Sequence, residues 1–523
     1  MSSSLIEFVK IDSCDDPIDH EDKLKVCNHL ACELYKKRNN QIIILSSLVL
    51  LLVVASCLAV CEYSGHNKPI MYGDFEAQRH WMELTINLPI SKWYFYDLDY
   101  WGLDYPVLTA YHSWILGKIW VELDKSRGLE QIEHKLFMRF SVIITFMLIY
   151  APALILLIIQ NEGRQNKISF LQLAQVLLFP GLLFIDCAHF QYNHLSLGLF
   201  LWAILAFDKG KLCLGSALFV LALNHKQMEL YHALPIAVFL FSRSFKRGQN
   251  IFTTIMESTS NLSKIFFVVF ATFFVLWAPF LLSNSSVALQ VLKRLFPFER
   301  GLFEDKVANF WCCASIFIKF KQIYSTENLI KMSTLLVLST CLPSLYCLLL
   351  KPNGRNFRIA LVICSLSFFL FSFQVHEKSI LLVGIPALLL LDDKTLGNSI
   401  GILLSTCCFS LFPLCMKDGV PEILPFFIFY HLFNVWMEKE RAKFNFLENK
   451  TKLMDYISWI SFILLLLINL SNIFVSPPKR YPDLFSMLNA LFCFFNFIYF
   501  YIYLNIEMIN SIRGRKLIGR KEE

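Results

Sequence analysis

Charged side chains are scarce in this sequence. They make up 17% of its 523 residues, whereas 56% of the residues are hydrophobic and phenylalanine alone supplies 50. Because a soluble chain of this size keeps about 25% charged residues, the composition excludes an ordinary water-soluble globular protein. It predicts an all-α polytopic membrane protein, since a segment that crosses the bilayer must satisfy its own backbone hydrogen bonds and a helix does so.

Several familiar signatures of chemistry are also missing. No glycine-rich phosphate-binding loop is visible, no set of cysteines and histidines has convincing metal-ligand spacing, and a Ser-His-Asp site cannot be argued from spacing. The 16 cysteines fall mostly within apolar runs and are interpreted as buried thiols. We find no internal repeat, and no cleavable signal peptide precedes Gln41. No metal site is therefore predicted.

Fourteen apolar segments are predicted to cross the membrane as helices. They lie at about residues 41–61, 138–158, 169–185, 194–207, 212–224, 227–241, 264–282, 331–350, 358–374, 379–391, 398–416, 420–437, 454–475 and 484–505. Several of them are shorter than the ~20 residues that a full span needs. Two further runs, 107–121 and 307–318, contain polar or charged residues, and we expect them to form helices at the membrane interface or partway into it.

Basic residues near the segment ends predict the orientation, because Lys and Arg are enriched in cytosolic loops. Lys36, Lys37 and Arg38 precede the first segment and place the N-terminus in the cytosol. Fourteen spans then bring the other basic loops to the same side: Arg164/Lys167, Lys209/Lys211, Arg243/Lys246/Arg247, Lys351/Arg355/Arg358, Lys439/Arg441/Lys443 and the tail from Arg513 to Lys521. Both chain ends are therefore expected to be cytosolic.

The polar, aromatic-rich loops all fall on the opposite side in this topology. They are 62–137, 189–193, 224–229, 283–330 and 374–379. The first of them contains Asp74 and Asp104, and acids beside a bilayer are costly enough to indicate a function; a hydrated loop with solvent-facing acids is the alternative. Carboxylates beside cations suit a reaction that needs a base and a phosphate clamp. The cations available are Lys226, Arg294, Arg300, His376 and Lys378.

Six strings in these loops carry a resemblance to a known family. They are GDFEAQRHW (73–81), WGLDYP (101–106), KQMELY (226–231), RLFP (294–297), GLFEDKVANFW (301–311) and VHEKS (375–379). The chain resembles the endoplasmic-reticulum glucosyltransferases that use dolichyl-phosphate glucose and have the GT-C fold. The QRHW and EDKVAN strings favour the branch that adds the first glucose over the sister branch that adds the second.

The resemblance implies a fold, an activity and partners. The fold would be a GT-C glycosyltransferase fold with about 14 transmembrane helices and a long first lumenal loop that carries interfacial helices. The activity would be that of a hexosyltransferase, which moves glucose from dolichyl-phosphate glucose to the terminal mannose of Man(9)GlcNAc(2)-PP-dolichol in α-1,3 linkage with inversion. The partners would be this donor, this acceptor and membrane lipid, with no nucleic acid. Because the leaving group is already a phosphate, no metal or other cofactor is expected.

The same resemblance assigns roles to individual residues. Asp74 would be the general base, which an inverting transfer needs on the face opposite the leaving group. Binding of the substrate and the donor phosphate would fall to Arg79, Asp104, Lys226, Arg294, Asp305, His376 and Lys378. The chain departs from the family pattern at Val107, Cys187 and His225, which leaves the fit of the neighbouring loops open.

Three of these residues have a plainer alternative role. Asp74 could cap a helix that begins at Phe75, because Asp is a favoured N-cap residue. Asp104 precedes Tyr-Pro and could only shape a turn. Lys378 stands at a helix junction, where it could simply extend its ammonium group toward the interface.

Further polar residues are open to similar alternatives. Asp305 and Glu304 could only pair with Lys306. His189 and Gln191 are interpreted as polar groups of the core whose hydrogen bonds are satisfied there. For the whole chain, the alternative from a different class is a polytopic lipid or sugar transporter or flippase, although such proteins often show inverted repeats and none is found here.

The expected organisation has four parts: a cytosolic N-terminal tail (1–40), a transmembrane catalytic module (41–391) with lumenal loops 62–137 and 283–330, C-terminal transmembrane helices (392–505) and a cytosolic basic tail (506–523). The resemblance implies a multi-pass protein of the endoplasmic reticulum membrane with a lumenal active site. The final residues, Arg520-Lys521-Glu522-Glu523, are similar to a dilysine-type retrieval signal. Asn284 begins the sequon on the predicted lumenal side and is the glycosylation candidate.

Overall fold

The computed structural model describes residues 20–120, 127–128, 131–162, 169–245, 250–296, 302–303, 305–444 and 451–519. Within these ranges the regular structure is helical, and β-structure is limited to one isolated bridge between Phe303 and Val375. The predicted all-α class is confirmed. Arg300, Glu304 and the tail sequence 520–523, all singled out above, lie outside the described residues.

Seven helical runs in this part of the chain are long and apolar enough to cross a membrane. They belong to α1 (His20–Ala59), to the continuous run of α4 (Ile132–Thr145), η2 (Phe146–Tyr150) and α5 (Ala151–Glu162), to α11 (Ile251–Ser283), α15 (Thr326–Leu350) and α16 (Gly354–Phe371), to the run of α18 (Gly397–Ser410) and α19 (Phe412–Asp418), and to α22 (Leu484–Gly519). An eighth is a pair bent by 46°, in which α6 (Phe170–Leu177) meets α7 (Pro180–Leu183) and η3 (Phe184–Phe190).

Further helices pack alongside these runs. They are α8 (Asn193–Asp208), α9 (Leu212–His225), η4 (Gln227–His232), α10 (Ala233–Ser244), η5 (Glu377–Ile380), α17 (Leu381–Leu388), η6 (Pro421–Ile423), α20 (Leu424–Phe444) and α21 (Thr451–Phe474). Each of the fourteen predicted segments coincides with helix, whereas the number that cross the bilayer stays a prediction.

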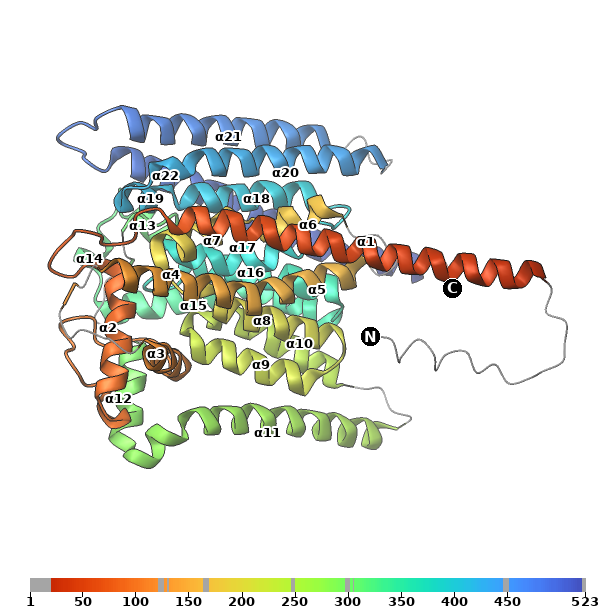
Figure 1. The fold of residues 1–523 in the computed structure, drawn as a ribbon, viewed down its shortest axis with the longest axis horizontal. Helices are drawn as coiled ribbons and strands as arrows, with labels where there is room; N and C mark the ends of the chain where they lie inside the picture. The colour runs from red at the N-terminus through yellow and green to blue at the C-terminus, as the bar shows by residue number, and fades with distance from the viewer. Residues whose placement is uncertain are drawn as a thin grey trace.

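A second set of helices lies across one end of this bundle. It comprises α2 (Gly73–Asn87), η1 (Ile90–Lys92), α3 (Val107–Ile119), α12 (Ser285–Leu295), α13 (Phe310–Ala314) and α14 (Phe320–Ile323). In Figure 1 the long helices run side by side, and α2 and α12 stand across their left-hand ends, while the N-terminal end of α1 projects from the other end. This arrangement gathers the polar loops at one end of the bundle, as the interfacial helices predicted for 62–137 and 283–330 require.

Burial separates the centre of the bundle from its rim. In the run of α18 and α19, 89% of the most apolar stretch of residues is buried inside the protein. In α11 the corresponding fraction is only 11%. The exposed side of α11 carries phenylalanines such as Phe266, Phe267 and Phe270. Such a face is stable against lipid but not against water, so α11 belongs at the lipid-facing rim and α18 in the core.

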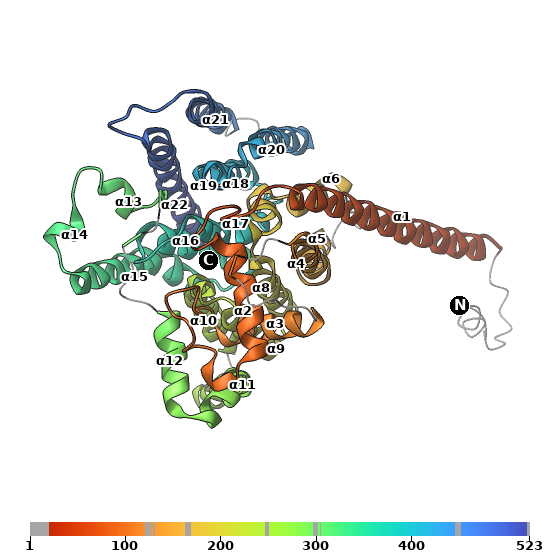
Figure 2. The same ribbon diagram turned by 60° about the vertical axis from the view of Figure 1, so that its left-hand side comes forward.

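Breaks in the helices place polar groups at the end where α2 lies. The π-helical turn η3 stops at Phe190, and α8 starts only at Asn193, so the first backbone N–H groups of α8 need acceptors. Asp186 supplies them, because its Oδ1 accepts from the Asn193 N–H (3.2 Å) and its Oδ2 from the His194 N–H (2.7 Å). The start of α8 is thereby fixed beside η3, and η3 contacts α2, which lies at the end of the bundle nearest the viewer in Figure 2.

Candidate active site

A polar cavity of about 790 Å³ opens beneath α2. Seven of the eight residues predicted to bind substrate or act on it line this one cavity: Asp74, Asp104, Lys226, Arg294, Asp305, His376 and Lys378. They come from loops and helix ends spread over more than half of the chain, so the fold brings them together. A space of this size fits within the range typical of sites for small molecules.

The start of α2 presents Asp74 to the cavity. Gly73 has a positive φ of 68°, and a Cβ there would lie 2.4 Å from the carbonyl oxygen of Ser64. Only glycine therefore lets the chain at Ser64 pass so close to the first turn of α2. Asp74 follows in that first turn, whereas the capping position is held by Tyr72, and neither residue makes a side-chain cap. The N-cap alternative for Asp74 is thus excluded by the geometry.

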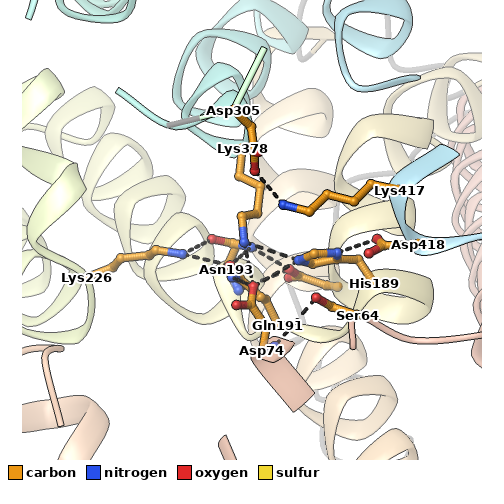
Figure 3. Close-up of polar contacts among 11 residues, drawn as sticks. Ser64, Asp74, His189, Gln191, Asn193, Lys226, Asp305, Lys378, Lys417 and Asp418 are labelled. Atoms are coloured by element: carbon orange, nitrogen blue, oxygen red, sulfur yellow. Dashed lines mark hydrogen bonds and ion pairs between the residues drawn. The ribbon is translucent and has the colours of Figure 1, made fainter. Parts of the chain in front are cut away.

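One oxygen of Asp74 collects three donors. Its Oδ2 lies 2.5 Å from Nζ of Lys378, 2.9 Å from Nε2 of His189 and 2.6 Å from Nε2 of Gln191. Its Oδ1 has no hydrogen-bond partner in the described part of the chain, and 23% of the side chain is exposed to the cavity. Figure 3 shows Lys378 reaching this carboxylate between Lys226 and His189.

The charges around Asp74 keep it ionised. Burial alone would raise the pKa of this carboxyl group, but the ammonium of Lys378 and the hydrogen bonds from His189 and Lys378 outweigh burial and hold the pKa well below its usual range. Lys378 responds in the opposite sense, since burial lowers its pKa but the Asp74 carboxylate raises it above the ordinary value. Lys378 therefore does not extend toward solvent as an isolated cation; it is held by Asp74.

His189 connects Asp74 to a residue that sequence reasoning missed. Its Nδ1 lies 2.5 Å from Oδ2 of Asp418, which ends α19, and its Nε2 faces Asp74. Both His189 and Asp418 are nearly fully buried. His189 and Gln191, interpreted from sequence as core groups, both bond the Asp74 carboxylate. Asp418 and its neighbour Lys417 also line the cavity, so helices beyond residue 391 contribute to it.

Lys226 approaches the cavity without a carboxylate among its contacts in the described ranges. Its Nζ donates to Oδ1 of Asn193 and to Oε1 of Gln191 (3.0 Å), and it lies 5.1 Å from the ring centre of Tyr105. Burial, together with the nearby ammonium of Lys378, lowers the pKa of Lys226 to about 8. Asn193 is itself held by Asp186 through a 2.7 Å hydrogen bond, so Lys226 is an oriented cation.

The remaining cavity residues are fixed by other contacts. Arg294 donates from its guanidinium to the carbonyl oxygens of Gly102 (2.8 Å) and Leu103 (3.2 Å), which holds the loop that carries Asp104. Asp305 pairs with Lys417 at 2.6 Å.

The alternative pairing of Asp305 with Lys306 is not formed. Lys306 instead lies 2.8 Å from Asp483, in the segment between α21 and α22. The cation that Asp305 contacts therefore comes from the C-terminal helices, and it lines the same cavity.

Arg79 is the one predicted site residue that does not line the cavity. It is fully buried, and its guanidinium donates to Glu76 (2.7 and 2.8 Å) and to Glu83 (3.1 Å) on the same helix. Tyr100 donates to Glu76 as well (2.8 Å). Arg79 thus holds Glu76, which joins α2 to the loop at Tyr100, and we leave Arg79 out of the proposed site.

Two further expectations concern glycosylation and metal binding. Asn284 is exposed and caps α12 by accepting from the Ser286 N–H (3.1 Å), and its glycosylation stays a prediction. Among the described residues, no group of three or more His, Cys, Asp or Glu side chains is arranged to hold a metal ion.

Comparison with known proteins points to one family. The model of the ALG6, ALG8 glycosyltransferase family matches residues 43–504. A protein of Pongo abelii named dolichyl pyrophosphate Man9GlcNAc2 alpha-1,3-glucosyltransferase is 41% identical over 487 residues, covering 87% of this chain and 94% of its own length. A Caenorhabditis elegans protein with the same name, marked probable, is 44% identical over 466 residues and 86% of each chain. A Gallus gallus protein of that name is 42% identical over 479 residues, covering 86% of this chain and 92% of its own length.

Proposed function

The chain belongs to the ALG6, ALG8 glycosyltransferase family, and we propose that it transfers glucose from dolichyl-phosphate glucose to the terminal mannose of Man(9)GlcNAc(2)-PP-dolichol in α-1,3 linkage. Its relatives of about 40% identity carry the name of this acceptor and linkage. The donor, the inversion of configuration and the role of each residue are parts of the proposal.

The observation that carries the proposal is that the two carboxylate oxygens of Asp74 have different surroundings. Three donors hold Oδ2, so the carboxylate cannot rotate freely, and Oδ1 is left to face the cavity. A general base must reach the proton that it removes and must be ionised when it does so. Oδ1 of Asp74 meets both requirements, and we assign it to the acceptor hydroxyl.

Lys226 and Lys378 are the cations that we assign to the donor phosphate. Lys226 is oriented by two neutral amide oxygens, which leaves its charge uncompensated by direct contact with a carboxylate in the described chain. The ammonium of Lys378 is paired with Asp74. A bound phosphate competes for the ammonium of Lys378, and because that ammonium is what depresses the Asp74 pKa, competition makes Asp74 a stronger base.

The reaction then balances without an added co-reactant. The acceptor oxygen attacks C1 of glucose, the bond from C1 to the phosphate oxygen breaks, and its electron pair stays on the phosphate. The hydroxyl proton passes to Oδ1 of Asp74. Attack from the face opposite the phosphate inverts C1, and one base is enough for such a single-step transfer.

The location of the reaction follows from where the cavity lies in the fold. The site stands at the end of the bundle that carries α2 and α12, where a lipid-linked donor can present its sugar from the bilayer. We place this end in the lumen of the endoplasmic reticulum and both chain ends in the cytosol, as the distribution of basic residues predicts.

Glucosyl transfer by the purified protein tests the proposal. Dolichyl-phosphate glucose is supplied with either the nine-mannose acceptor or the once-glucosylated acceptor. We expect transfer to the first acceptor only, and we expect it to persist in EDTA. Transfer to the once-glucosylated acceptor alone would assign the sister activity, and movement of lipid across vesicles without transfer would assign the transporter class.

A further inference from the structure

The hydrogen bond between Asp74 and His189 requires one proton, which either residue can carry. Nδ1 of His189 is 2.5 Å from a buried carboxylate oxygen of Asp418, so it carries a hydrogen that it donates there. Nε2 lies 2.9 Å from Oδ2 of Asp74. If Nε2 carried no hydrogen and Asp74 were ionised, two lone pairs would face each other. A proton must therefore sit on His189 or on Asp74, unless Nε2 accepts instead from Lys378, which lies 3.1 Å away.

The position of this proton decides whether Asp74 can act as a base. When His189 is an imidazolium, Asp74 stays a carboxylate whose Oδ2 is held and whose Oδ1 is available. When the shared proton lies on Asp74 instead, His189 is neutral and the protonated carboxyl group cannot take the proton of the acceptor hydroxyl. A carboxylate on the far side of an imidazole stabilises the charged ring and fixes its orientation.

We propose that Asp418 is a positioning residue, which acts through His189 to keep Asp74 ionised and its Oδ1 directed at the acceptor hydroxyl. This inference rests on the proposed function of Asp74. Asp418 is suited to the role because its side chain is only 4% exposed and it ends α19 directly before Gly419, whose φ of 79° turns the chain away. A residue of the C-terminal helices thus contacts the proposed base through His189.

The surrounding charges agree with this assignment. The charged and titratable groups that face the pair are Asp74 on α2, His189 on η3, Lys226 after α9, Glu377 and Lys378 on η5, and Lys417 and Asp418 on α19. Among the groups in direct contact, the carboxylates of Asp74 and Asp418 are balanced by Lys378 and the imidazolium of His189. A neutral His189 between two ionised carboxylates would leave a buried excess of negative charge, which is costly.

The pH dependence of kcat in Asp418→Asn tests the inference, measured with both substrates saturating. Asparagine keeps the acceptor for the Nδ1 hydrogen but removes the charge that favours the imidazolium. The shared proton then lies on Asp74 and blocks the base until it is lost at higher pH. If this proton titrates near pH 6.5, as that of an ordinary histidine does, we expect kcat of the variant to rise about fourfold between pH 6 and pH 8. We expect the wild-type kcat to stay nearly level over this range, and Asp418→Glu, which restores the charge, to recover the level profile.

Two comparisons show whether Asp418 acts through His189. In a His189→Gln background, Asp418→Asn should change kcat by less than about twofold, because the coupled partner is gone. Asp483→Asn removes an acid of the C-terminal helices that pairs with Lys306 away from the cavity, and it should keep the wild-type profile.

A level profile in Asp418→Asn would overturn the inference, because it would mean that His189 is neutral and accepts from Lys378. The proposed function would then still stand on Asp74→Asn, whose full activity is the result that would remove the base itself. If Asp418→Asn does not fold, His189→Gln decides: we expect kcat to fall about tenfold or more with the KM for donor within about twofold. Loss of donor binding with kcat unchanged would overturn the inference.

Discussion

The ammonium nitrogen of Lys378 on η5 lies 2.5 Å from Oδ2 of Asp74 on α2, across a separation of 304 residues in the chain. This ion pair is partly buried and keeps the proposed base charged. It also weakens that base, because a proton added to Asp74 would have to displace a close positive charge. A donor phosphate that draws on the same ammonium would release the base only when the sugar to be transferred is present.

Asp74→Asn should abolish most turnover while the protein folds and binds donor. Asparagine can keep its carbonyl oxygen toward Lys378, His189 and Gln191, but an amide cannot take the acceptor proton, and a general base contributes roughly 10²–10⁴-fold to rate. Asp74→Glu should also be poor, because a shift of the reacting group by about 1 Å can cost ~10²-fold. Transfer and donor binding are measured on the same purified sample.

The matched control for this substitution is Asp97→Asn. Asp97 follows α2 in the same loop region and pairs with Arg127 at 2.5 Å, outside the cavity. It should retain near-normal transfer. Near-normal transfer by Asp74→Asn itself would remove Asp74 from the mechanism and turn attention to Asp104 and Asp305, which line the same cavity.

Sequence reasoning located the helices well, because long apolar runs leave the backbone few alternatives in a bilayer. The convergence of Asp74, Lys226 and Lys378 on one cavity was accessible only through family resemblance, since their loops are far apart in the chain. Asp418 gave no signal of its own: Lys417-Asp418-Gly419 has the pattern of an ordinary helix end, with Gly419 in the left-handed region.

The position of Arg79 on α2 could have been read from the spacing of residues in the sequence. A helix turns about 100° per residue, so Arg79 points about 140° away from Asp74 around the axis of α2. The same spacing brings Glu76 and Glu83 to the side of Arg79, at three and four residues. Helical geometry alone therefore argues for an internal ion pair rather than a shared substrate site.

Arg79→Gln should destabilise the protein more than it alters substrate binding. The guanidinium and Glu76 are almost fully buried, and removal of one partner of a buried pair costs about 3–5 kcal/mol, because the other charge is left without compensation. We expect a lower Tm in detergent, with the KM for donor in the folded fraction near the wild-type value. A large increase in KM with an unchanged Tm would return Arg79 to the substrate site.

Cysteine labelling tests the orientation of the bundle. Lys209→Cys, exposed between α8 and α9, should react with a membrane-impermeant maleimide from the cytosolic side of sealed microsomes, whereas Gln131→Cys, exposed before α4, should react only after the membrane is opened. The parent protein gives the background from its own cysteines. Labelling of Gln131→Cys from the cytosol would mean that 107–121 crosses the bilayer, which would put the cavity on the wrong side.

The lowered pKa of Lys226 predicts that kcat/KM for the donor decreases at alkaline pH. With a pKa of about 8, its ammonium is mostly charged below that pH and mostly neutral above it. Because kcat/KM reports the groups of the free enzyme, kcat/KM for the donor should fall about fivefold between pH 8 and pH 9. The value of kcat at saturating donor should fall less, because a bound phosphate stabilises the ammonium.

Substitution of Lys226 separates its charge from its shape. Lys226→Met should raise the KM for donor and remove the alkaline limb, since no titrating group is left at this position. Lys226→Arg should also lack the alkaline limb, because a guanidinium stays charged. Its planar group does not reproduce the contacts with Gln191 and Asn193, so the activity of this variant should be lower at every pH. An alkaline limb that persists unchanged in both variants would assign the titration to another group and remove Lys226 from the phosphate site.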